Sequence, residues 1–119
     1  MTFEHTATNL PAENEYPKLV RDRIPEIIVE ADGREVPVRT LELDEFIDYL
    51  KKKAVEEAEE LSATDTDPHL LEEIADLREI LDTLEAAKGF TPEQVKTVQD
   101  EKRTKRGGFD LRLLMLNND

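Results

Sequence analysis

Two long stretches of this chain repeat apolar residues at the spacing of an α-helix, and a short break separates them. With successive residues about 100° apart around a helix, the apolar residues of each stretch share one face. The face in residues 44–63 comprises Phe46, Ile47, Leu50, Ala54, Ala58 and Leu61, and the face in residues 68–88 comprises Leu70, Ile74, Leu77, Leu81 and Leu84. In the break, TDTDP, Asp67 is the predicted N-cap and Pro68 the first helical residue. The sequence therefore predicts two antiparallel helices packed through these faces.

Two further helices are predicted. A short one begins at Pro25 and ends at Gly33, and a longer one over residues 92–106 follows Thr91 as its cap and ends before Gly107. The predicted fold is therefore all-α. Two long amphipathic helices and a shorter third bury only a thin core, so we expect oligomerisation to complete a helical bundle. A homodimer would form a four-helix bundle, and two dimers would form a homotetramer.

The remaining segments are less regular. Residues 36–42 and 109–115 are rich in apolar and β-branched residues and are predicted to pair as a small two-stranded β element. Residues 1–15 show no sustained periodicity and are expected to form a flexible leader. Residues 16–119 are then expected to form a single helical domain.

Four carboxylates lie on or beside the two apolar faces. Spacing alone does not select them, because the chain contains many other acid pairs at i, i+3. Helical phase places Glu57 within the first apolar face and Glu60 at its edge. It places Glu73 within the second face and Asp76 at its edge. The acids of the two helices that are predicted to point to solvent are Glu56, Glu59, Glu79 and Asp82.

If the apolar faces meet, these four carboxylates meet as well. Like charges repel, and burial penalises each ionised group, so either the acids bind protons or a cation lies between them. A set of ligands that consists only of oxygen atoms favours a hard ion, Mg²⁺ or Mn²⁺. In the alternative interpretation, the acids reach solvent or pair with basic residues, for example Asp76 with Arg78 or Lys53. His69, at the start of a helix, is expected to have no role.

The overall charge excludes some partners. The net charge is −13, and such a field repels the phosphates of a nucleic-acid polymer. The chain has no cysteine, which excludes disulfides and cysteine-zinc sites. No apolar run approaches the length of a membrane span, and the N-terminus lacks the features of a signal peptide. We therefore expect a cytoplasmic protein that binds no membrane.

At this point the sequence resembles a known superfamily. VEEAEEL (residues 55–61) followed by LEEIADL (residues 71–77) is similar to the ExxE…ExxD signature of the all-α NTP pyrophosphohydrolases. That group includes MazG-like enzymes, dimeric dUTPases and phosphoribosyl-ATP pyrophosphohydrolase. KLVRDRIPEII (residues 18–28) and KRGGF (residues 105–109) resemble the ends of a small MazG-like branch described as house-cleaning nucleotide pyrophosphatases. The resemblance covers about residues 16–116.

The resemblance implies an enzyme that cleaves the α–β phosphoanhydride of a nucleoside triphosphate, canonical or noncanonical, to NMP and pyrophosphate. It implies that Mg²⁺ is bound by Glu57, Glu60, Glu73 and Asp76. Glu57 or Glu60 is the expected catalytic residue, accepting the proton of the attacking water. The basic residues expected to bind substrate phosphate are Lys18, Arg21, Arg23, Lys105 and Arg106.

Two other functions remain open. The same acids would serve a phosphoribosyl-ATP pyrophosphohydrolase of histidine biosynthesis, because that reaction cleaves the same type of bond. Alternatively, the chain is a non-catalytic acidic helical interaction module, in which the carboxylates on the apolar faces set the register of an oligomer.

Overall fold

The computed structural model describes residues 17–118, and its regular elements are all helices. They are α2 (Ile24–Asp32), α3 (Leu43–Ser62), α4 (Asp67–Ala87) and α5 (Pro92–Arg106). This confirms the predicted helical class. The predicted leader, residues 1–15, lies outside the described residues.

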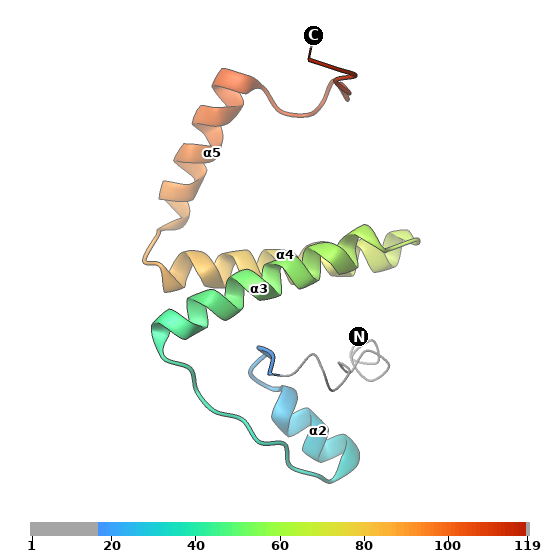
Figure 1. The fold of residues 1–119 in the computed structure, drawn as a ribbon, viewed down its shortest axis with the longest axis vertical. Helices are drawn as coiled ribbons and strands as arrows, with labels where there is room; N and C mark the ends of the chain where they lie inside the picture. The colour runs from blue at the N-terminus through green and yellow to red at the C-terminus, as the bar shows by residue number, and fades with distance from the viewer. Residues whose placement is uncertain (1–16, 119) are drawn as a thin grey trace.

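The centre of the fold is the antiparallel pair of α3 and α4, which lie side by side in Figure 1. Between these helices, the amide of Ala63 donates to the carbonyl of Glu60 and closes α3. The hydroxyl of Thr66 then accepts from the amide of His69, 3.3 Å away, and starts α4. Thr66, and not the predicted Asp67, is therefore the N-cap, because its hydroxyl makes the capping hydrogen bond.

The buried apolar core of the described chain is small. Among residues 17–118, the buried apolar side chains are Leu50, which is 1% exposed, and Ile28 of α2. Three members of the predicted α4 face, Leu70, Ile74 and Leu81, are exposed. Two helices alone do not enclose a complete core, because each covers only one side of the other.

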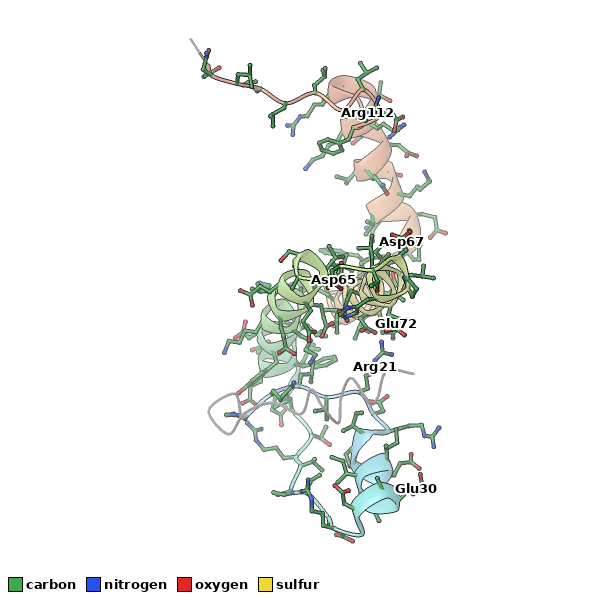
Figure 2. All side chains as sticks on the ribbon, turned by 90° about the vertical axis from the view of Figure 1, so that its right-hand side faces the viewer. Arg21, Glu30, Asp65, Asp67, Glu72 and Arg112 are labelled. Carbon is green, nitrogen blue, oxygen red and sulfur yellow. The ribbon has the colours of Figure 1, made fainter. Side chains whose placement is uncertain are left out.

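The segment before α2 is tied to the hairpin by ion pairs. Lys18 contacts Glu56 of α3 at 3.4 Å, and Arg21 contacts Asp76 of α4 at 2.8 Å. Figure 2 shows Arg21 between α2 and the hairpin. Helix α2 ends at Gly33, whose φ of 69° is left-handed and whose amide donates to the carbonyl of Val29.

Helix α5 leaves the hairpin and points away from it (Figure 1). Its first turn is closed by a capping box, in which Thr91 and Gln94 exchange side-chain-to-backbone hydrogen bonds. After Gly107 the chain makes a turn, in which the amide of Arg112 donates to the carbonyl of Phe109, and then forms no regular element up to Asn118. The apolar side chains from Phe109 to Leu116 are 76–95% exposed.

The predicted β element is wrong. Residues 36–42 and 109–115 form no strand in the described chain. The first segment joins α2 to α3 and the second follows α5 at the far end of the molecule (Figure 1), so neither has a neighbour with which to form a ladder. None of the helices in residues 17–118 combines the length and apolar character required to cross a membrane.

Candidate metal centre

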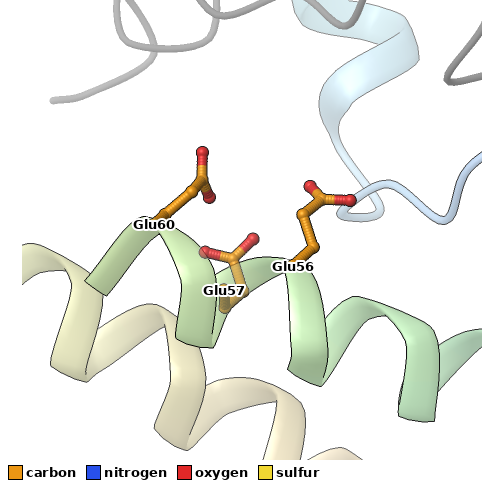
Figure 3. A group of neighbouring side chains, drawn as sticks. All are labelled: Glu56, Glu57 and Glu60. Carbon is orange, nitrogen blue, oxygen red and sulfur yellow. The ribbon is translucent and has the colours of Figure 1, made fainter. Parts of the chain in front are cut away.

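The acids of α3 and α4 form two groups that share Glu57. One group consists of Glu57, Glu73 and Asp76, and it draws on both helices. The other consists of Glu56, Glu57 and Glu60, all on α3. Figure 3 shows the side chains of this second group on neighbouring turns of α3. Glu57 therefore lies where a single carboxylate can serve two neighbouring cation positions.

The dimensions of both groups suit a small divalent cation. In each group, one ligand atom per residue lies within 4.8 Å of the others. Mg²⁺ holds its oxygen ligands at about 2.1 Å, so oxygens on opposite sides of the ion are separated by about 4.2 Å. Small rotations of the side chains would bring either group to that spacing. The ligand set fits the predicted ion, because carboxylate oxygens are the ligands that Mg²⁺ prefers.

Burial makes this cluster unfavourable without a positive charge. Glu73 is 1% exposed and Glu57 is 7% exposed. The pKa of Glu57 is raised to about 8, first by burial and then by the negative charge of Glu60, and hydrogen bonds with Glu73 and Glu60 also favour its protonated form. The charge of Lys53 opposes this increase only in part. At neutral pH and without a cation, Glu57 therefore retains a proton.

Lys53 is the cation of α3 nearest to this cluster. Its ammonium lies 3.7 Å from Glu57 and 2.9 Å from Glu56. Burial acts to lower the pKa of Lys53, but the hydrogen bond and charge of Glu56 outweigh it and the pKa is raised. For Glu56 itself, burial is likewise outweighed by Lys53 and Lys18, and the pKa of this carboxyl is lowered. Glu56 is thus ionised and already paired, whereas Glu57 is not neutralised by Lys53.

Two further side chains reach the acids of α4. Asp76 pairs with a basic residue, as in the alternative interpretation, but its partner is Arg21 and not Arg78 or Lys53. The Nε2 atom of His69 lies 3.6 Å from Glu73, one helical turn away, and forms an ion pair with it when the imidazole is protonated. A divalent cation bound to Asp76 would therefore compete with Arg21 for the same carboxylate.

The predicted phosphate-binding residues are divided by the fold. Lys18 and Arg21 lie at the acids of the hairpin through their ion pairs with Glu56 and Asp76. Arg23 instead pairs with Glu26 within α2, at 3.0 Å. Lys105 and Arg106 lie at the end of α5 that points away from the hairpin (Figure 1). Within one chain, the structure brings only the first two of these five residues to the acids.

The sequence analysis did not predict that Glu56 and His69 would contact other residues at the acid cluster. Glu56 was predicted to face solvent, but it is half-buried between two lysines. Lys53, three residues earlier on the same helix, was the available signal, since i, i+3 side chains of opposite charge meet. The spacing of His69 and Glu73 at i, i+4 gave the same kind of signal for His69.

No family model, curated protein or solved structure matches this chain. The fold and the site define an all-helical protein with clustered carboxylates that could bind a metal ion.

Proposed function

We propose that this chain is a Mg²⁺-dependent nucleotide pyrophosphohydrolase, which cleaves a nucleoside triphosphate to NMP and pyrophosphate. The observation that supports this most is the position of Glu57, a buried carboxylate shared by two acid groups, one on α3 alone and one on both α3 and α4. Repulsion and burial make such a cluster of ionised carboxylates unfavourable for stability. A bound divalent cation would neutralise this charge, which is why the cluster suits a metal site.

The residues at the acid cluster would have three roles in this reaction. Glu57, Glu60, Glu73 and Asp76 would hold Mg²⁺, which when bound neutralises phosphate oxygens and acidifies a water molecule. Glu60 is half-buried on the edge of the cluster and would be the general base. Arg21 and Lys18 would bind phosphate oxygens, since both already lie beside the acids.

A homo-oligomer is part of the proposal. Leu70, Ile74 and Leu81 share one face of α4 and are 36–44% exposed, so a second hairpin that packed on this face would complete a four-helix core. Sedimentation equilibrium over a wide concentration range tests this. A dimer or tetramer is expected, and a monomer at every concentration would contradict it.

The activity is tested by incubating the protein with Mg²⁺ and a panel of NTPs, dNTPs and phosphoribosyl-ATP, with released pyrophosphate as the readout. We expect release from at least one NTP or dNTP, a loss of about a hundredfold or more in Glu57→Gln, and no change in Glu59→Gln, whose side chain is exposed on the same helix. Release from phosphoribosyl-ATP alone would assign the chain to histidine biosynthesis. No release from any compound would leave the non-catalytic interaction module as the better account.

A further inference from the structure

A second feature adjoins the carboxylates on the side of α3 that faces the segment before α2. A cavity of about 270 Å³ lies there, lined by Pro17, Leu19, Tyr49 and three lysines together with Glu56. The three lysines are Lys18, Lys52 and Lys53. Glu56, drawn in Figure 3 beside Glu57 and Glu60, belongs both to the acid cluster and to the wall of this cavity.

The cavity is a local exception to the charge of the chain. Its lining carries three ammonium groups and one carboxylate in a protein of net charge −13. Lys18 and Lys53 both contact the same oxygen of Glu56, at 3.4 and 2.9 Å, and their side chains are only 15% and 16% exposed. Lys53 also lies 3.7 Å from Glu57 and is affected by the negative charge of Glu60, so neighbouring carboxylates offset the charges of Lys18 and Lys53.

Lys52 adds a third charge that Glu56 does not balance. Its ammonium lies 4.8 Å from the centre of the Tyr49 ring, a cation–π distance that holds the side chain at the wall of the cavity. The ion pairs of Lys18 and Lys53 account for the attachment of residues 17–19 to α3. These ion pairs do not explain why Lys52 also lines the cavity or why the cavity is open.

We propose that this cavity, the lysine pocket, is a phosphate-binding subsite. Ammonium groups bind phosphate oxygens, and partial burial strengthens each contact. The pocket shares Glu56 with the acid cluster, so a ligand with several phosphates would reach both the pocket and a cation held by the acids. The inference deepens the proposed function and rests on it for the identity of the ligand, a polyphosphate. It adds Lys52 and Lys53 to the residues that contact this ligand.

The test is titration calorimetry of the full chain with inorganic pyrophosphate in EDTA, so that binding through a divalent cation is absent. Wild-type protein is expected to bind pyrophosphate, and Lys18→Gln and Lys52→Gln are each expected to weaken binding about tenfold or more. Lys51→Gln is the matched control, because Lys51 is an exposed lysine of the same helix that does not line the cavity. Circular dichroism checks that each variant retains its helices.

The outcomes separate this inference from the proposed function. No binding by wild type, or equal loss in Lys51→Gln, overturns the lysine pocket, even if pyrophosphate is released from NTPs. Binding that depends on Lys18 and Lys52 supports the pocket, even if no nucleotide is hydrolysed and the proposed function fails.

Discussion

Glu57 of α3 and Glu73 of α4 each place a carboxylate oxygen within 4.8 Å of the other across the two-helix hairpin, and both side chains are buried. Two buried carboxyl groups at this separation are not both ionised unless a cation lies near them. The pKa of Glu57 is raised to about 8 by burial and by the charge of Glu60, so the metal-free cluster holds a proton at neutral pH. A divalent cation would displace the proton and take its place between the two helices.

The first prediction concerns pH and stability without metal. The pKa of an unfolded glutamate is about 4.3, and that of Glu57 in the folded chain is about 8. Between these values the folded protein holds a proton that the unfolded chain has lost, so the free energy of unfolding falls as pH rises. Melting curves in EDTA should show a decreasing melting temperature from pH 5 to 8, and Glu57→Gln should remove most of that slope. A melting temperature that rises across this range in wild type would contradict the account.

The second prediction concerns Mg²⁺ and the melting temperature. A cation that binds only the folded chain raises the melting temperature with its concentration. Because the cation must displace the proton of Glu57, we expect a larger increase at pH 8 than at pH 6. Asp76→Asn should abolish the response, whereas Asp82→Asn, which changes an exposed acid of the same helix, should retain it. Equal responses in the two variants would argue against binding at Asp76.

The third prediction concerns Arg21. Its pair with Asp76 is largely exposed, so Arg21→Gln should change the free energy of unfolding by no more than about 1 kcal/mol. If Arg21 binds substrate phosphate, the same variant should lower kcat/KM by about tenfold or more. Arg34→Gln is the control, because Arg34 pairs with Asp32 at the end of α2, outside the acid cluster. Unchanged kinetics in Arg21→Gln would remove Arg21 from the site.

The fourth prediction concerns the small core. Leu50 is almost fully buried, so Leu50→Ala should reduce the free energy of unfolding by about 2–5 kcal/mol. Leu71 of α4 is 69% exposed, and Leu71→Ala should change it by less than about 0.5 kcal/mol. Urea denaturation followed by circular dichroism measures both. Similar changes in the free energy of unfolding in the two variants would show that Leu50 does not lie in the core of the hairpin.

Helical periodicity predicted the elements that depend on local sequence. The two long helices, the break between them and the third helix after Thr91 occur as predicted, because caps and apolar spacing are local properties. Residues 36–42 and 109–115 failed as strands, since a strand needs a partner that local sequence does not supply.

In the site, too, local sequence predicted some features, whereas contacts with distant segments could not be predicted. Helical phase placed Glu57 and Glu73 within apolar faces, and the structure buries both. The partners of these acids come from elsewhere in the chain: Lys18 and Arg21 reach Glu56 and Asp76 from a segment 38 and 55 residues away. Such contacts depend on how the segment before α2 crosses the hairpin, which periodicity within α3 and α4 does not specify.

The central claim is that α3 and α4 hold a divalent cation at Glu57. Titration calorimetry with Mn²⁺ at pH 8, in which Mn²⁺ substitutes for Mg²⁺, tests it most directly. The account predicts saturable binding to the wild-type chain, binding at least tenfold weaker, by about 1.4 kcal/mol or more, in Glu57→Gln, and unchanged binding in Glu59→Gln. Absence of saturable binding to the wild-type chain, or equal binding by Glu57→Gln, would contradict it.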